Sequence, residues 1–275
     1  MGLKTVVLNS ERMNYDGKLD LSVLSSEVKE YASTEQDQIL ERVQGMDVVV
    51  TKEMPVDGDT IARFPDSVQL ICEAGTGYNN IDIEAARARG ITVCNIPAYS
   101  TERVAHTAIM MILNLSSSMQ IQQAMLARGD RSNFTKCMQV SHVEVNGKVL
   151  GVVGAGTIGR EVIKVAQALG MKVLAYTRTP RADEDNLKYV SLEELLKQSD
   201  YISLHCPLTP QTRHMINKET IAMMKPTAYI INTGRGALID EPALIEALKE
   251  GRIAGAGLDV QETEPPVQDN PLYDM

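Results

Sequence analysis

The residues with the clearest chemical meaning are three glycines spaced as Gly-x-Gly-x-x-Gly. An apolar run from Val149 precedes them, an amphipathic stretch through Gly170 follows, and a second apolar run, Met171 to Tyr176, comes next. This order predicts a strand, a tight turn, a helix and another strand. The first glycine allows the turn, the second lets the backbone approach a pyrophosphate, and the third lets the helix pack close to the strand. A lone motif of this kind often marks only a turn, but this context predicts a dinucleotide site at Gly154, Ala155, Gly156, Thr157, Ile158 and Gly159.

Small, polar and charged residues follow the other strands expected in this half of the chain. Those strands are Val149–Val153, Lys172–Tyr176, Tyr201–His205, Ala228–Asn232 and Ala254–Leu258. Ligands of open parallel sheets bind beyond the carboxyl ends of the strands. Strand ends are commonly polar, so these residues become informative through their agreement with the glycine turn. The further cofactor-binding candidates are Thr177, His205, Cys206, Pro207, Thr233, Gly234, Arg235 and Asp259.

Strands alternate with helices in the first third of the chain as well. The strands expected there are Thr5–Leu8, Asp47–Val50, Val68–Cys72 and Ile91–Cys94, with helical stretches at Thr34–Val43 and Ile83–Arg89. Such alternation predicts parallel sheets with helices on both faces. We therefore expect an α/β fold of two Rossmann-like domains, one flavodoxin-like and one dinucleotide-binding. Their expected ranges are 1–98 and 99–275, with a ligand-binding cleft between them.

A long apolar helix is expected from Glu102 to Leu115, with Ser100 or Thr101 as its N-cap. Apolar residues cover most of its circumference, so one face can pack on its own domain while another needs a partner. The segment Ser116–Asn146 is polar and irregular, and we expect an arm or loop that wraps a neighbour. Together these features predict a homodimer formed through the nucleotide domain. The alternative is that both helix faces are buried within the monomer.

Bulk properties exclude several other functions. The 275 residues carry a formal net charge of -9 without a basic cluster, so we expect no nucleic-acid partner. No apolar run approaches the length of a membrane span, and the chain opens on a strand-like segment rather than a signal peptide. The four cysteines have no metal-like spacing, so we expect no metal site and reduced, mostly buried thiols in a cytoplasmic protein. These cysteines are Cys72, Cys94, Cys137 and Cys206.

Several short motifs occur together from residue 70 to the C-terminus. They are Gly75–Asp82, Gly154–Gly159, His205–Thr209, Ile231–Gly236, Gly257–Val260 and Glu262–Pro265. In this order they resemble the D-isomer-specific 2-hydroxyacid dehydrogenase family. Within that family, Ala74–Asp82 together with Asn95–Thr101 is most similar to glycerate dehydrogenases, also called hydroxypyruvate reductases.

The resemblance implies roles for the matching residues. Arg235 would be catalytic and would hold the carboxylate and carbonyl of a 2-oxo acid, because a guanidinium donates two parallel hydrogen bonds. Glu264, also catalytic, would orient and charge the histidine of the family, and Asp259 would contact the nicotinamide carboxamide. The substrate carboxylate would be bound from the other domain by Gly75, Thr76 and Gly77. Taken singly, Arg235 could form a surface salt bridge, the glycines a plain turn, and Glu264 an acidic loop.

One family feature is missing from these residues. The catalytic histidine normally follows the glutamate within a Pro-His segment, before a closing helix, but the sequence ends at Met275, eleven residues after Glu264. None of the four histidines matches that position: His205 lies at a strand end that resembles a cofactor-contacting position, His106 is expected to pack within the long helix, and the other two are expected on the surface. Those two are His142 and His214.

A second departure concerns the cofactor. NAD-specific relatives carry an aspartate after the second strand that binds the ribose hydroxyls. Here the corresponding segment is Thr177-Arg178-Thr179, with Arg181 close behind. A hydroxyl and guanidiniums attract a 2′-phosphate that an aspartate would repel, so NADP(H) is favoured while NAD(H) stays possible. The alternative is a solvated basic turn.

The sequence therefore predicts an NAD(P)-dependent oxidoreductase acting on the CH–OH group. Its expected substrates are small 2-oxo acids such as hydroxypyruvate or glyoxylate, and its activity is expected to be impaired in this chain. Two alternatives are a catalytically inactive NAD(P)-binding regulatory protein and a degenerate product of a shortened gene.

Overall fold

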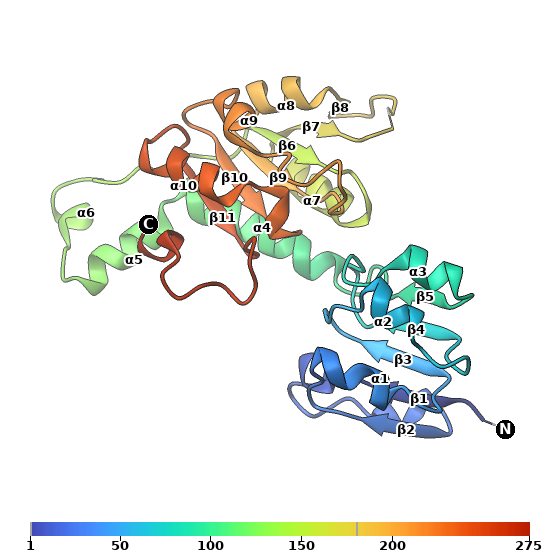
Figure 1. Cartoon of the computed structure of the whole chain (residues 1–275). Helices are drawn as coiled ribbons and strands as arrows, with labels where there is room; N and C mark the ends of the chain where they lie inside the picture. The colour runs from blue at the N-terminus through green and yellow to red at the C-terminus, as the bar shows by residue number, and fades with distance from the viewer. Residues whose placement is uncertain (1, 180) are drawn as a thin grey trace. The chain divides into compact units, whose positions relative to one another are not determined.

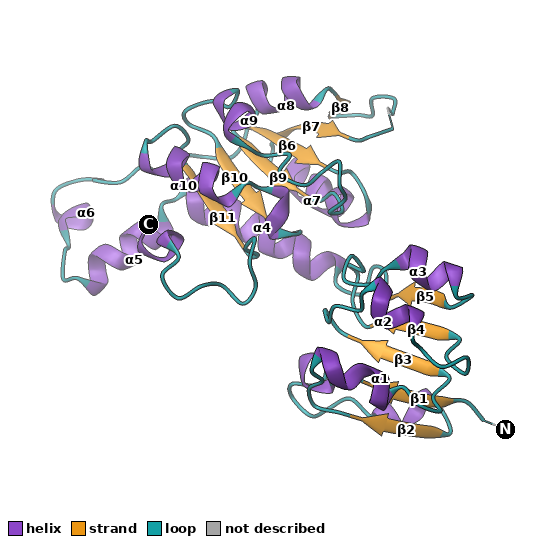
Figure 2. Ribbon diagram, in the orientation of Figure 1, coloured by secondary structure: helices purple, strands orange, loops and turns teal. Residues whose placement is uncertain are grey.

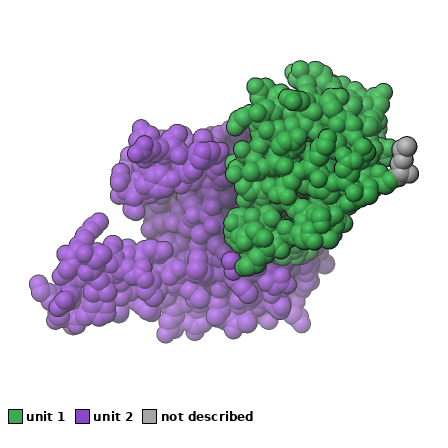
Figure 3. Space-filling model, turned by 90° about the horizontal axis from the view of Figure 1, so that it is seen from below, with its two compact units in different colours: residues 1–99 green, residues 100–275 purple. Residues whose placement is uncertain are grey.

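The computed structural model describes residues 2–179 and 181–275, and it is traced from N- to C-terminus in Figure 1. The chain divides into two compact units, Met1–Tyr99 and Ser100–Met275, which Figure 3 colours separately. This division lies one residue from the boundary expected from the sequence. The roles of the two parts, substrate binding and dinucleotide binding, stay predictions. Each unit is described by itself below.

The first unit is built on a five-stranded parallel sheet in the order β2-β1-β3-β4-β5. Its strands are β1 (Lys4–Val7), β2 (Glu27–Glu30), β3 (Val48–Thr51), β4 (Leu70–Glu73) and β5 (Thr92–Asn95). Its short helices are α1 (Ile39–Arg42), α2 (Gly58–Ala62) and α3 (Ile83–Ala88), with 3-10 turns at Ser10–Arg12, Leu21–Leu24 and Gln36–Gln38. Val6, Val49 and Ile71 from three adjacent strands are buried in one core with helix residues such as Ile39 and Ile61.

Local sequence fixes where these helices begin. The Asp57 side chain accepts a hydrogen bond from the Thr60 amide and starts α2, and Asp82 accepts one from Ala85 and starts α3. The expected helix at Thr34–Val43 forms as a 3-10 turn followed by α1. Strand β2 was not expected, since its residues are polar and half-buried at best; pairing with β1 produces it.

The second unit contains a six-stranded parallel sheet in the order β11-β10-β9-β6-β7-β8. Its strands are β6 (Val149–Val153), β7 (Lys172–Tyr176), β8 (Leu187–Tyr189), β9 (Tyr201–Leu204), β10 (Tyr229–Asn232) and β11 (Gly255–Leu258). Counted within the unit, this is the doubly wound order 3-2-1-4-5-6, whose direction of winding reverses between β6 and β9. A ligand site is therefore expected at the carboxyl ends of those two strands.

Helices cover both faces of this sheet, as Figure 2 shows. One core packs α4 (Thr101–Ser116) and α7 (Thr157–Ala168) against the sheet, through residues such as Ile112 and Val162. The other packs α8 (Leu192–Gln198), α9 (Lys218–Ala222) and α10 (Glu241–Lys249) on the opposite face. The remaining elements are α5 (Met119–Ala127), α6 (Ser132–Thr135), and 3-10 turns at Gly236–Leu238 and Pro271–Asp274. The α/β fold class with two parallel sheets is confirmed.

Three expectations about local structure were wrong. The segment Ser116–Asn146 is not irregular throughout, because it contains α5 and α6. His106 does not pack within α4 but is exposed, and of the four cysteines Cys94 and Cys137 are exposed while the other two are only partly buried. His106 and Cys94 lie on the faces that α4 and β5 turn away from the core, and Cys137 lies in a bend after α6, which periodicity alone left open. All four cysteines are free.

Candidate dinucleotide and substrate site

The glycine turn between β6 and α7 is sterically closed to larger residues at two positions. Gly154 has φ +100°, and a Cβ there would lie 2.7 Å from the backbone nitrogen of Cys206. A Cβ on Gly159 would lie 2.1 Å from the carbonyl oxygen of Gly154. Gly156, by contrast, is exposed and has open space around its Cβ position. The first and third glycines thus let the turn and helix pack, and the second leaves room for a bound group, as the motif predicts.

The residues after β9 lie directly against this turn. The amide of His205 donates to Val153 O at 2.8 Å, and the Cβ position of Gly154 faces the His205–Cys206 peptide. The His205 Nε2 lies 2.8 Å from Ser203 Oγ, and burial lowers the pKa of this imidazole to about 4. Burial also raises the pKa of the Cys206 thiol to about 11. At neutral pH both groups are uncharged. His205 is therefore a neutral polar side chain at this strand end rather than a proton donor.

A buried asparagine shapes the loop after β10. Asn232 Oδ1 accepts from the Gly234 amide at 3.1 Å, and its Nδ2 donates to Arg235 O at 2.9 Å. Arg235 is half-buried, and its Nη1 donates to Gly234 O at 2.9 Å. Among the described residues, the buried Thr233 Oγ1 has no hydrogen-bond partner. A buried hydroxyl without a partner is costly, so this atom suits a ligand group that bonds to it. The residues at this edge therefore fit a dinucleotide.

The two acidic candidates near the end of the chain are both exposed. The amide of Asp259 donates to Asn232 O at 2.9 Å, which fixes Asp259 beside the Arg235 loop. Glu264 accepts a hydrogen bond from the Gln261 amide at 3.1 Å. The neighbouring glutamate, Glu262, is the one that pairs with a histidine, a contact that sequence reasoning missed.

Glu262 Oε1 lies 2.6 Å from His214 Nε2 and 2.8 Å from Arg213 Nη2. Burial alone would raise the pKa of Glu262, but the hydrogen bonds from His214 and the Glu241 amide hold it below its usual value. His214 is half-buried by this contact rather than lying freely on the surface. The sequence could not predict that the basic residues at positions 213 and 214 pair with residue 262, because the two segments lie far apart in sequence.

The basic turn after β7 presents one arginine to solvent. Thr177 Oγ1 donates to Thr179 O at 2.7 Å, and Arg178 is exposed, with no acceptor among the described residues. Arg160 and, more weakly, Arg181 lower the pKa of Glu184. Among the described residues, no carboxylate pairs with Arg178 and would compete with a bound phosphate for it.

The substrate-loop candidates lie in the first unit, at the end of β4. Gly75 is buried, Thr76 Oγ1 donates to Ile96 O at 3.2 Å, and Asn95 Nδ2 donates to Thr76 O at 2.7 Å. In the part of the chain that the structure describes, the amides of Thr76 and Gly77 donate to no acceptor. Two neighbouring free amides suit an anionic group.

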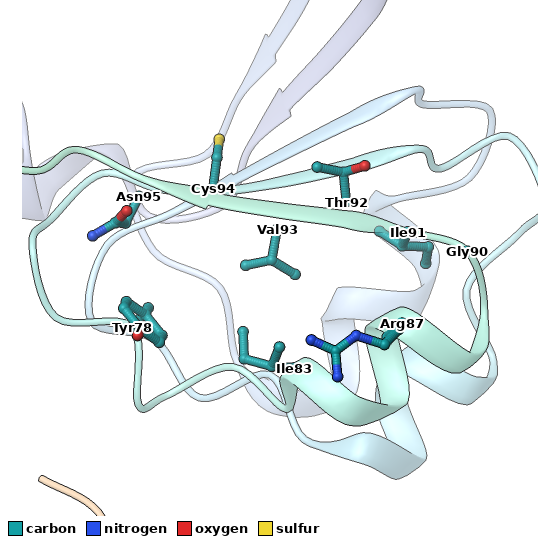
Figure 4. A pocket seen from close by; sticks show the side chains of 9 residues that line it. All are labelled: Tyr78, Ile83, Arg87, Gly90, Ile91, Thr92, Val93, Cys94 and Asn95. Carbon is teal, nitrogen blue, oxygen red and sulfur yellow. The ribbon is translucent and has the colours of Figure 1, made fainter.

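A pocket of about 570 Å³ also belongs to the first unit, between β5 and α3. Val93 and Ile83 face each other across it, whereas the Cys94 sulfur points away (Figure 4). None of the predicted site residues lines it. Tyr78 and Asn95, which donates to Thr76 O, link it to the loop that contains Thr76 and Gly77. No group of three metal-ligating side chains occurs within residues 2–179 and 181–275, and no helix there could cross a membrane.

A parallel sheet wound in this order, with a glycine turn at its switch point, defines a dinucleotide-binding α/β protein. Residues 109–275 match the model of the family described as D-isomer specific 2-hydroxyacid dehydrogenase, NAD binding domain. The chain belongs to this family of NAD(P)-dependent oxidoreductases that act on the CH–OH group, as its motifs predicted.

Several characterised proteins are similar over most of the chain. A hydroxypyruvate reductase of Blautia hydrogenotrophica is 41% identical over 243 residues, which cover 87% of this chain and 75% of the relative. A glycerate dehydrogenase of Methylorubrum extorquens is 41% identical over 251 residues, covering 90% and 78%. Among solved structures, a glyoxylate reductase from Paecilomyes thermophila has a TM-score of 0.84 at 34% identity, covering 98% of this chain and 85% of that one.

Proposed function

We propose that the protein transfers a hydride between NADP(H) and a small D-2-hydroxy acid, with hydroxypyruvate or glyoxylate as the oxidised substrate. The observation that carries this proposal is the placement of the glycine turn and the Arg235 loop on either side of the end of β9, at the edge where doubly wound sheets bind dinucleotides. The dinucleotide supplies the hydride. Arg235 binds and orients the substrate carboxylate and carbonyl, and its guanidinium offsets the negative charge that develops on the oxygen.

The substrate carboxylate is further proposed to be held by the free amides of Thr76 and Gly77 in the first unit. Because a lysine cannot reproduce two parallel hydrogen bonds, Arg235→Lys should weaken the binding of oxalate, a 2-oxo acid analogue, at saturating NADPH. Calorimetry measures that affinity. Undiminished oxalate binding by the variant contradicts the role of Arg235.

We propose that the 275-residue polypeptide turns over slowly or not at all. Reduction of a ketone leaves an alkoxide that needs a proton, and a positioned general acid typically contributes about 10²–10⁴-fold. His205 is neutral and hydrogen-bonded to Ser203, His214 is paired with Glu262, and His106 and His142 are exposed. Steady-state assays with hydroxypyruvate and glyoxylate test this on a product whose mass is verified. Dinucleotide binding without turnover would favour the regulatory alternative, and turnover at the rate of the relatives would contradict the proposal.

A preference for NADPH over NADH is supported by Thr177 and the exposed Arg178. Solved relatives carry either cofactor: an acyclic imino acid reductase contains NADPH and a D-lactate dehydrogenase contains NAD. Fluorescence titration should show tighter NADPH binding, and Arg178→Ala should weaken NADPH about 10-fold while sparing NADH, as for a charge-assisted hydrogen bond. Equal affinities for both cofactors would mean that the turn is only solvated.

A homodimer is proposed on the apolar residues that α4 and the following segment expose. Met110 and Leu113 on α4 are 52% and 40% exposed, and Ile121 on α5 is 54% exposed. Phe134 and Met138 farther along are 64% and 68% exposed. Exposed apolar side chains that recur along α4 and the segment after it favour a second copy as their cover. Sedimentation should show a dimer, and the double variant Met110→Lys with Ile121→Lys should be a monomer. A monomer of the unsubstituted protein at micromolar concentration would refute the dimer.

The free cysteines suit the cytoplasmic location expected from the sequence, which cell fractionation tests.

A further inference from the structure

A lysine lies beside the proposed substrate loop that neither the glycine motifs nor Arg235 explains. Lys52 follows β3, and its backbone is clamped on both sides by the buried Asn9 side chain: Lys52 N donates to Asn9 Oδ1 at 2.9 Å, and Asn9 Nδ2 donates to Lys52 O at 2.6 Å. Only 15% of the lysine side chain is exposed. This chain segment is therefore fixed, and the ammonium has little freedom to move into solvent.

The ammonium points to the start of the loop. Lys52 Nζ lies 3.0 Å from the position that a Cβ on Gly75 would occupy. The free amides of Thr76 and Gly77 belong to the next two residues. A buried carboxylate, Glu73, ties these segments together, because it accepts hydrogen bonds from the Glu53 amide, Thr51 Oγ1 and Asn80 Nδ2, each at 2.9 Å.

Two carboxylates lie near the Lys52 ammonium: the buried Glu73, whose Oε1 is also 3.0 Å from the Cβ position of Gly75, and the exposed Glu53, which pairs with it directly. Lys52 Nζ contacts Glu53 Oε1 at 2.7 Å, and the Glu53 side chain is 52% exposed. Glu53 has φ +54°, a conformation that is unfavourable for a residue other than glycine and that places its side chain next to the ammonium. A largely buried cation with a solvent-exposed counter-ion can exchange that partner for another anion at small cost.

We propose that Lys52 is a specificity-determining residue whose ammonium binds the substrate carboxylate together with the amides of Thr76 and Gly77. The inference rests on the proposed function and deepens it, since it assigns the first unit a fixed positive charge in addition to neutral donors. The ammonium selects compounds that carry a free carboxylate next to the carbonyl over the corresponding esters, amides and aldehydes. Glu53 is the counter-ion in the absence of the ligand and competes with it.

Oxalate titrations at saturating NADPH test this assignment by calorimetry. Lys52→Met removes the charge while keeping most of the side chain's apolar length, and it should weaken oxalate binding about 10-fold or more. Lys52→Arg keeps the charge and should restore most of the affinity. Glu53→Gln is the matched control: it breaks the same ion pair but leaves the ammonium, so oxalate should bind as tightly or more tightly.

The outcomes separate the two proposals. Equal losses in Lys52→Met and Glu53→Gln would show that only the ion pair matters, and unchanged affinity in Lys52→Met would likewise overturn the role of Lys52. If Lys52→Met keeps its affinity for oxalate while Arg235→Lys loses it, the proposed function stands and only the role of Lys52 is refuted. Failure of the unsubstituted protein to bind oxalate overturns both. NADPH affinity, which depends on the second unit, verifies that each variant is folded.

Discussion

Replacing His205 should make the folding stability of the protein fall less when the pH is lowered. In the unfolded chain a histidine takes up its proton near pH 6.5, whereas burial in the folded protein lowers the pKa of His205 to about 4. Between these values the unfolded state binds more protons, so folding stability falls as the pH falls. At about 1.36 kcal/mol for each pH unit, the two pKa values correspond to a full loss of about 3 kcal/mol, and of about 2 kcal/mol at pH 5.

The assay is urea unfolding of the protein and of His205→Gln at pH 7.5 and pH 5.0. Glutamine keeps a polar group near Ser203 but cannot be protonated, so the variant should lose about 2 kcal/mol less than the unsubstituted protein between the two pH values. Carboxyl groups titrate in both proteins and cancel in the comparison. His142→Gln is the control, because His142 is exposed and its replacement should leave the pH dependence unchanged. Equal pH dependence in His205→Gln and the unsubstituted protein, or an NMR titration of His205 near pH 6.5, would refute the reasoning.

Two further predictions concern steric fit and buried hydrogen bonds. Gly159→Ala should destabilise the protein by about 1–3 kcal/mol and abolish dinucleotide binding, because its Cβ would collide with Gly154 O; Gly156→Ala, with open space around the Cβ, should weaken binding but leave the thermal melting temperature unchanged. Equal melting temperatures for the two variants would contradict this. Glu73→Gln should cost about 1–3 kcal/mol in urea unfolding, since its amide nitrogen must face either the Glu53 amide or Asn80 Nδ2, both donors. Unchanged stability would show that the loop does not depend on these bonds.

The sequence by itself determined the alternation of strands and helices and the location of the glycine turn. Buried parallel strands read as continuous apolar runs, and all nine strands expected from such runs form within a few residues of their predicted bounds. The turn was equally legible, because the spacing of its glycines is local: Gly159 is required by the carbonyl of Gly154 five residues earlier, although Gly154 itself faces the distant His205–Cys206 peptide. Strands β2 and β8 were not predicted, because β2 is mostly polar and β8 has only three residues; both form strands by pairing with β1 and β7.

Only the tertiary structure decided which side chains meet. The Glu262–His214 contact joins positions 48 residues apart, and the clamp of Lys52 by Asn9 joins positions 43 residues apart. No local pattern encodes such pairs, since they depend on which strand ends become neighbours in the sheet. Burial is likewise a property of the folded surroundings. His205 is a weak base because its partial burial disfavours the charged imidazolium, whereas His106, on an apolar helix, faces outward.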